Sequence, residues 1–447
     1  MADQCALRVM RELSQFARSD DISIVISYKE TNIREINALV IGPPDTPYAL
    51  GFYQFLITIP PDYPEKPPIV RLQTTNRGQT RFGPNLYAGG KVCLSILGTW
   101  RAESNEQWTP VLGLETVLRS IQSLLAAKPF NLEPGFEDEP DNAQSQGYNA
   151  KVAMCPEIKH ESLRLTVITP LEQAYGIRPP RPSGRPNEDR YYEPGHPDPS
   201  LLDEPVNLFL DTYKRRFMWY LEYYKMAIQQ GLKEGRGRAG HPFPQAPFEY
   251  PGNYMIGSWD YEGLEKRLEV LELRIKAETN SWVIEGRRME RKKMPLAASL
   301  RAQRDQIVLQ VAQRTDGMVT LELVDDNPFL WRLIYHGRPM TQFDGGVLKI
   351  KIFISPNHPA EQPRVLLETP LYHVRVSPQN VLIYLPLQAD EMSRHIDGII
   401  SSLEEEKPPV NPMMTVNPEA SALCWGSEAD QRQYRRNLRR SVAATLE

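Results

Sequence analysis

The sequence pattern of a helix followed by a four-stranded meander occurs twice in these 447 residues, and this repeat limits the possible folds. In each half, a helical stretch precedes four β-type segments joined by short links. Parallel strands need a crossover of about a dozen or more residues, so such links indicate antiparallel strands. The chain is also too long for one hydrophobic core. We therefore predict an α+β protein with two copies of one helix-plus-meander unit.

The first copy opens with a predicted helix over residues 3–17, where Leu7, Met10 and Leu13 recur at helical spacing. A second helix is predicted at GLETVLRSIQSLLAA (113–127), whose apolar residues share one face. The strand-like segments between them are ISIVIS (22–27), EINALVIG (35–42), GFYQFLITI (51–59) and PIVRLQT (68–74). Gly and Pro interrupt the sequence around Cys93, which predicts irregular backbone there.

The second copy repeats this order after a predicted helix over residues 296–313. Its turns match those of the first copy, since Gly337 to Gly346 corresponds to Gly42 to Gly51. Its strand-like segments are MVTLELV (318–324), FLWRLIYHG (329–337), LKIKIFIS (348–355) and PRVLLET (363–369). The sequence therefore predicts a second domain over residues 296–447.

The region between the copies has two parts. Eight prolines between residues 179 and 205 exclude a regular element, so residues 176–205 are predicted to form an extended insertion or linker. Helical spacing resumes over residues 207–230 and 260–278, which predicts a helical extension over residues 206–280. The first domain is then expected to comprise residues 1–175.

The composition limits the cellular compartments and the classes of binding partner that are expected for this chain. The four cysteines form no C-x-x-C pair, which argues against a disulfide framework or a structural zinc site. The net charge of −4 gives no general attraction to nucleic acid or to anionic membranes, and the basic run RQYRRNLRRS is interpreted as the solvated face of a helix. No membrane span or signal peptide is recognised, so a cytoplasmic or nuclear location is expected.

Several separated motifs resemble those of ubiquitin-conjugating enzymes. They are Tyr63-Pro64 with Pro68, Pro84-Asn85, Cys93-Leu94 and Trp108-Thr109-Pro110, in the order and spacing of that family. The phrases KVCLSILGTW, NLEPGFE and KHESLRLTV are most similar to the large Z-type members. The resemblance extends over roughly residues 1–280 and implies the ubiquitin-conjugating fold.

The resemblance also implies a chemistry. Cys93 would accept ubiquitin or a ubiquitin-like modifier from an activating enzyme as a thioester, and pass it to a substrate lysine or a ligase cysteine. Asn85 matches the residue that supports the oxyanion, and Glu133 is a candidate for orienting the lysine. The implied partners are the modifier, the activating enzyme, ligases and protein substrates. No cofactor or metal is implied, because ATP is used by the activating enzyme.

One position departs from the family pattern. The family usually has His-Pro-Asn, whereas Gly83 precedes Pro84-Asn85 here. We expect this difference to alter the packing of the loop more than its chemistry.

Three other interpretations stay open from the residues alone. Cys93 is compatible with a small hydrophobic core residue in a binding-only relative. A cysteine hydrolase would need a histidine base, for which His160 is the nearest downstream candidate. Asn85 is compatible with a turn residue, because Pro-Asn pairs favour turns.

The second copy lacks the residues of this chemistry. His373-Val374-Arg375 occupies the place of the Asn85 motif, and Ile383 stands eight residues after Arg375. We therefore predict an inactive conjugating-type domain that serves as a binding platform. The competing hypothesis for the whole chain is a non-catalytic adaptor that binds ubiquitin or ligases.

Overall fold

A computed structural model of the chain describes residues 4–17, 21–100, 107–133, 148–177, 208–235, 237–405 and 408–446. The predicted insertion at 176–205 lies almost entirely outside the described residues. The contacts divide the chain into two compact units. The first comprises residues 1–213 and 227–268, and the second comprises residues 214–226 and 269–447.

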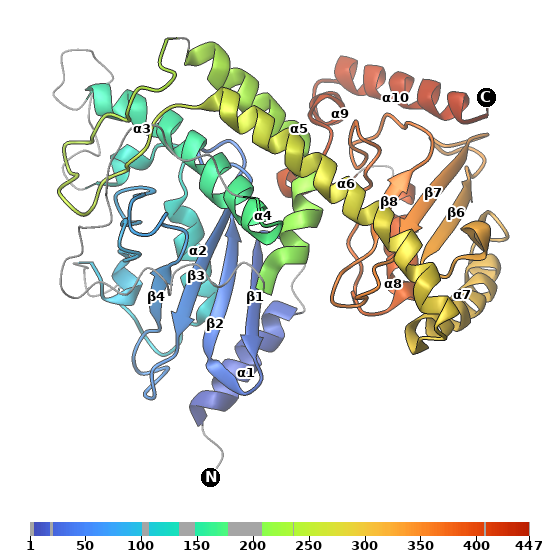
Figure 1. Cartoon of the computed structure of the whole chain (residues 1–447), viewed down its shortest axis with the longest axis horizontal. Helices are drawn as coiled ribbons and strands as arrows, with labels where there is room; N and C mark the ends of the chain where they lie inside the picture. Colours follow the sequence, from blue (N-terminus) through green and yellow to red (C-terminus); the bar gives the residue numbers. More distant parts are fainter. Residues whose placement is uncertain are drawn as a thin grey trace. The chain divides into compact units, whose positions relative to one another are not determined.

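The first unit contains the predicted helix, meander and second helix (Figure 1). Its four strands form one antiparallel sheet in the order β1-β2-β3-β4. These elements are α1 (Gln4–Ala17), β1 (Ile24–Lys29), β2 (Asn32–Ile41), β3 (Phe52–Thr58), β4 (Ile69–Leu72), the 3₁₀ turn η1 (Ser95–Leu97), α2 (Leu114–Leu124) and the 3₁₀ turn η2 (Pro129–Leu132). The predicted order of helices and strands is confirmed.

The buried face of α1 differs from the apolar spacing read in the sequence. Leu7 and Met10 are exposed, whereas Val9 and Leu13 are buried. Glu12 is also buried on this side, where its carboxylate accepts hydrogen bonds from the Leu114 amide at 2.9 Å and the Tyr63 hydroxyl at 2.7 Å. The carboxylate therefore satisfies a free amide and complements the dipole at the start of α2.

The helical region that follows was only partly predicted. It comprises α3 (Tyr148–Glu161), a π-helical stretch η3 (Ser162–Ile168), α4 (Thr169–Ala174), α5 (Leu210–Glu234) and α6 (Tyr261–Arg291). Helix α6 continues 13 residues beyond the predicted end at residue 278. The predicted stripe of α5, from Phe209 to Ile228 through four aromatic residues, is buried.

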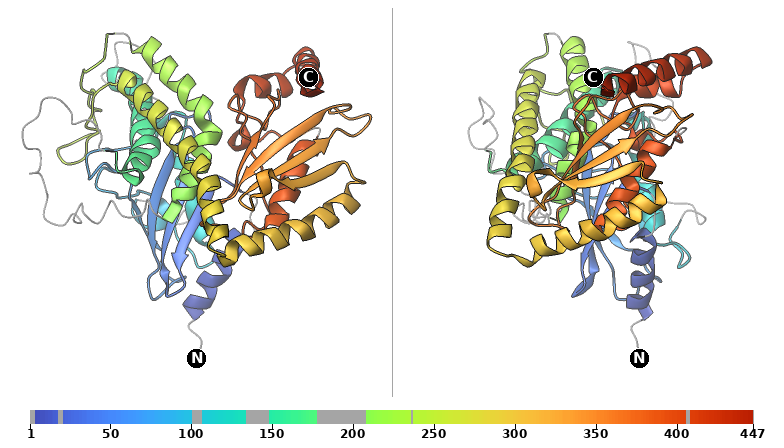
Figure 2. Two further views of the ribbon diagram at one scale, coloured as in Figure 1. Left: turned by 45° about the vertical axis from the view of Figure 1, so that its right-hand side comes forward. Right: turned by 90° about the vertical axis from the view of Figure 1, so that its right-hand side faces the viewer.

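The second unit repeats the helix-plus-meander arrangement (Figures 1 and 2). Its sheet has the order β5-β6-β7-β8, again antiparallel throughout. Its elements are α7 (Pro295–Arg314), β5 (Val319–Leu323), the turn η6 (Val324–Asp326), β6 (Leu330–His336), β7 (Val347–Phe353), β8 (Arg364–Leu367), α8 (Met392–Glu404), η7 (Pro412–Met414), α9 (Pro418–Cys424), α10 (Glu428–Ala443) and η8 (Ala444–Leu446).

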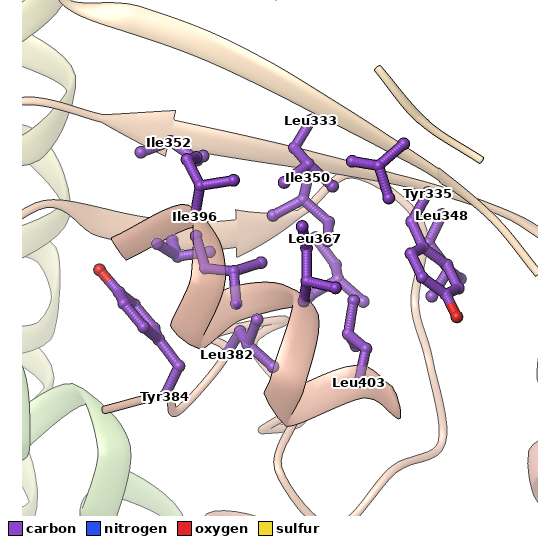
Figure 3. Close-up of a cluster of buried hydrophobic side chains, with 14 of the residues drawn as sticks. Leu333, Tyr335, Leu348, Ile350, Ile352, Leu367, Leu382, Tyr384, Ile396 and Leu403 are labelled. Atoms are coloured by element: carbon purple, nitrogen blue, oxygen red, sulfur yellow. The ribbon is translucent and has the colours of Figure 1, made fainter. Parts of the chain in front are cut away.

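The alternating residues of β7 build the core of this unit. Leu348, Ile350 and Ile352 are buried together with Ile396 and Leu403 of α8, which covers one face of the sheet (Figures 2 and 3). Lys349 lies between them on the opposite face and is exposed. This alternation is what a half-buried strand requires, and the core gives the second unit its own source of stability.

The turn that joins the second and third strands of each sheet has the same geometry in both units. Gly42 donates from its amide to Gly51 O at 2.8 Å, and Gly337 donates to Gly346 O at 2.9 Å. A Cβ atom on Gly42 would lie 1.8 Å from Tyr48 O, and one on Gly337 would lie 1.6 Å from Phe343 O. Both positions therefore need glycine, because the backbone approaches too closely for any side chain.

Gly337→Ala is expected to destabilise the second unit by about 2–3 kcal/mol, since the backbone turn has to open to admit a methyl group. Hydrogen exchange of peptides from β6 and β7, followed by mass spectrometry, measures this loss as reduced protection. The exposed neighbour His336 provides the control, because His336→Ala should change protection by less than about 0.5 kcal/mol. Equal protection in both variants would contradict the close-approach argument.

Candidate active site

Cys93 and Asn85 are held together by reciprocal hydrogen bonds in the loop after β4. The Cys93 amide donates to Asn85 O at 2.9 Å, and the Asn85 side-chain Nδ2 donates to Cys93 O at 3.1 Å. Isolated bridges pair Leu86 with Val92 and Gly83 with Leu86, so the loop folds back on itself around these two residues. The carboxamide thus lies beside Cys93, and its Nδ2 carries a second N–H donor.

The backbone that follows Cys93 is fixed by Thr99. Its hydroxyl donates to Val92 O at 2.7 Å and accepts from the Leu94 amide at 3.0 Å. The intervening 3₁₀ turn ends at Gly98, which has a φ of 65°. Cys93 itself is 2% exposed.

Tyr87 is a site residue that sequence reasoning missed. Burial, together with its interaction with the Cys93 thiol, raises the pKa of Tyr87 to about 12. The Arg81 guanidinium lies over the Tyr87 ring, 4.7 Å from its centroid. The phenol is protonated at neutral pH, as an ordinary tyrosine is, and is able to donate a hydrogen bond near the thiol.

Glu133 follows η2 and lies at the edge of the same group of side chains. Its carboxylate is 3.8 Å from the Arg81 guanidinium, and its charge contributes to the raised pKa of Tyr87. Arg81 is 2% exposed, although sequence reasoning did not identify it. The structure thus brings Glu133 to the side of the site that carries Tyr87.

Gly83, which departs from His-Pro-Asn, lies against a tyrosine. The Tyr48 hydroxyl donates to Phe82 O at 2.5 Å and would lie 3.0 Å from a Cβ atom on Gly83. A larger side chain at position 83 would have to displace this hydroxyl. The local packing therefore accounts for the small residue.

Comparison with known proteins decides the family. A family model described as "Ubiquitin-conjugating enzyme" matches residues 8–154 and, separately, residues 301–441, which together make up more than half of the chain. The chain belongs to the ubiquitin-conjugating enzyme family. Both units belong to the match, so the conjugating fold occurs here in tandem, with a helical stretch between the copies.

Relatives of known name agree with this assignment. The chain is similar to proteins named ubiquitin-conjugating enzyme E2 Z from three vertebrates. They are those of Xenopus tropicalis (43% identical over 171 residues, 38% of this chain and 52% of that protein), Danio rerio (32% over 275 residues, 62% and 70%) and Homo sapiens (42% over 274 residues, 61% and 64%). The chain thus spans between 52% and 70% of the length of these relatives.

Members of this family work in general with ubiquitin, an activating enzyme and ligases. Among the residues that the structure describes, no three His, Cys, Asp or Glu side chains gather where they would hold a metal ion. No helix in the same ranges combines the length and the apolar character needed to cross a bilayer.

His160, the candidate base of a hydrolase, has a different environment. Its Nδ1 contacts Glu161 Oε1 at 3.0 Å, and its Nε2 accepts a hydrogen bond from the Asp260 amide at 3.0 Å. Its ring packs against Phe243 and Trp259. Both ring nitrogens are thus occupied, and the residue anchors the segment that leads into α6.

The second unit repeats the backbone pairing that surrounds Cys93 and Asn85 in the first unit, but with different side chains. The Ile383 amide donates to Arg375 O at 2.9 Å, and a bridge pairs Val376 with Leu382, as Leu86 pairs with Val92. Ile383 therefore stands in the position of Cys93, and Arg375 in that of Asn85. Burial, with a contribution from Arg375, lowers the pKa of the neighbouring His373 to about 3, so this imidazole is neutral.

Proposed function

We propose that this protein accepts ubiquitin or a ubiquitin-like modifier as a thioester on Cys93 and transfers it to a substrate lysine or a ligase cysteine. The observation that supports this most strongly is the pairing of Cys93 with Asn85, in which the Asn85 amide donor is bonded to the backbone carbonyl of the cysteine. A core cysteine needs no such neighbour. Family membership supplies the general reaction.

The first step is a thioester exchange. The Cys93 thiolate attacks the carbonyl carbon of the modifier's C-terminal thioester, a new C–S bond forms, and the thiolate of the activating enzyme leaves. One thioester replaces another, so the step is nearly balanced in energy and needs no bound metal or cofactor. Because Cys93 is 2% exposed, the side chains around it have to shift when the donor docks.

The second step demands more of the site. A lysine amine attacks the thioester carbonyl, and negative charge gathers on the carbonyl oxygen before the Cys93 thiolate leaves. A preorganised donor is worth most where this charge develops. We assign the role of donor to Asn85 Nδ2, and we assign to Glu133 the attraction of the incoming ammonium group and the acceptance of its proton.

The second unit is proposed to be catalytically inactive. Ile383 has no nucleophilic atom, while the surrounding backbone pairing and core are kept. Such a unit is suited to binding a partner or substrate, and this is the role that we assign to it.

Incubation of the full chain with activating enzyme, ATP and ubiquitin tests the proposed function. The expected result is an adduct that is lost on treatment with dithiothreitol and that peptide mapping locates at Cys93. Absence of any adduct with ubiquitin and with ubiquitin-like modifiers would instead support the non-catalytic adaptor.

A further inference from the structure

Arg81 makes an unusual set of contacts directly before the Pro84-Asn85 motif. Each of its three guanidinium nitrogens donates to a different backbone carbonyl. Nε binds Gly83 O at 3.0 Å and Nη2 binds Pro84 O at 2.8 Å, while Nη1 binds Phe248 O at 3.2 Å. Two of these carbonyls belong to the peptide groups that immediately precede Asn85.

The third carbonyl belongs to residues 242–258, a distant segment of the same unit that follows α5 along the chain (Figure 1). This segment lies beyond the first match to the family model, which ends at residue 154. This segment also accepts a hydrogen bond from the Arg81 amide at Tyr254 O, at 3.1 Å. Asn253 Oδ1 accepts from the Ala88 amide at 3.0 Å, and the Ile256 amide donates to Gln79 O at 2.8 Å. The segment is therefore bonded to Gln79, Arg81 and Ala88.

The side chains around the guanidinium complete its enclosure. The rings of Tyr87 and Phe248 lie 4.7 and 5.0 Å from it, and Glu133 is its counter-ion at 3.8 Å. A buried charge is tolerated only with such partners. The planar fork of an arginine reaches three acceptors in fixed directions, which the single nitrogen of a lysine does not.

We infer that Arg81 is a positioning residue for transfer to lysine, and that residues 242–258 are a working part of the site. Arg81 holds the backbone before Asn85 in place, so that the carboxamide faces the thioester carbonyl, and the distant segment holds Arg81. This inference rests on the proposed function. It predicts that an element outside the conjugating core sets the rate of the second step while leaving the first step unaffected.

The experiment separates the two steps on the full chain. Charging with ubiquitin is measured first, and the purified thioester is then mixed with free lysine in a single turnover. Arg81→Lys is expected to slow discharge about 10–100-fold, because a small displacement of a catalytic donor has effects of this size. Charging should stay within about threefold of wild type, as expected for the less demanding exchange.

A double variant supplies a readout that a general loss of structure would not give. If Arg81 acts through Asn85, Arg81→Lys combined with Asn85→Ala should discharge no more slowly than Asn85→Ala alone. The inference would be overturned if the losses of discharge rate in the two single variants multiplied in the double variant. It would also be overturned if Arg81→Lys lost charging and discharge equally. Failure of the wild-type protein to charge would count against the proposed function instead, so the two failures are distinguishable.

Asn253→Ala tests the distant segment without touching Arg81, and keeps the inference falsifiable should Arg81→Lys not fold. It removes the acceptor of the Ala88 amide, and discharge is expected to fall about 3–10-fold with charging retained. Asn32→Ala is the matched control, because Asn32 is an exposed asparagine at the start of β2 in the same unit, and it should stay within about twofold. Normal discharge in Asn253→Ala would show that the segment is not part of the site.

Discussion

Replacement of Cys93 by alanine is expected to abolish the modifier adduct, the largest effect that we predict. Alanine has no nucleophilic atom, and the neighbouring Tyr87 phenol is protonated at neutral pH, with burial raising its pKa further. Cys93→Ser should give a slower adduct that resists dithiothreitol, because an oxyester replaces the thioester. The measurement is non-reducing electrophoresis after incubation with activating enzyme, ATP and ubiquitin.

The other cysteines provide matched controls for this result. Cys155 and Cys424 are half-buried, and burial raises the pKa of both thiols, which lowers their thiolate fraction at neutral pH. Cys5 is buried with its sulfur 3.8 Å from Pro60 O. Single replacements of these three by alanine should therefore leave charging unchanged. An adduct that persists in Cys93→Ala and disappears with one of them would refute the assignment.

Much of the fold was predictable, because each meander is specified by local sequence. Alternating residues such as Leu348, Ile350 and Ile352 determine which face of a strand is buried. The turn glycines Gly42 and Gly337 fix where the chain reverses, through contacts within ten residues. Short-range patterns of this kind can be read directly from the order of the amino acids.

Features that depend on distant contacts were not predictable in the same way. The apolar spacing of α1 suggested a face with Leu7 and Met10, but both are exposed. A charged residue, Glu12, lies on the buried side because it bonds Leu114, 102 residues away along the chain. The spacing of apolar residues along a helix does not reveal a hydrogen-bond partner that lies far away in the sequence.

In the candidate site, too, residues in short local motifs were predictable and residues with distant contacts were not. Cys93 and Asn85 were identified because Pro84-Asn85 and Cys93-Leu94 resemble separate motifs of the family in order and spacing. Arg81 was missed because its environment includes Phe248, 167 residues further along the chain. An arginine between Thr80 and Phe82 gives no sign in sequence that it is buried, and only the structure shows what encloses it.

Replacement of Asn85 by alanine is expected to separate the two steps of the reaction. The carboxamide donates to the backbone carbonyl of Cys93, and we propose it as the oxyanion donor, so its loss should slow discharge to lysine by about 10²-fold, as single-donor losses do elsewhere. Charging should suffer much less, because less charge accumulates in an exchange between thioesters. Single-turnover discharge of the purified thioester, compared with the charging rate of the same variant, measures the ratio directly.

A purely structural role of Asn85 is the competing explanation for slower discharge. Asn85 Nδ2 donates to Cys93 O at 3.1 Å, so the side chain also holds the loop. If holding the loop were its whole role, charging and discharge would fall together and the unfolding temperature of the first unit would drop with them. Asn85→Asp is the sharper control, because it keeps the size of the side chain but removes the donor. Discharge at wild-type rate in Asn85→Asp would exclude a donated hydrogen bond to the oxyanion, whereas a loss as large as that of Asn85→Ala, with charging retained, is what the geometry predicts.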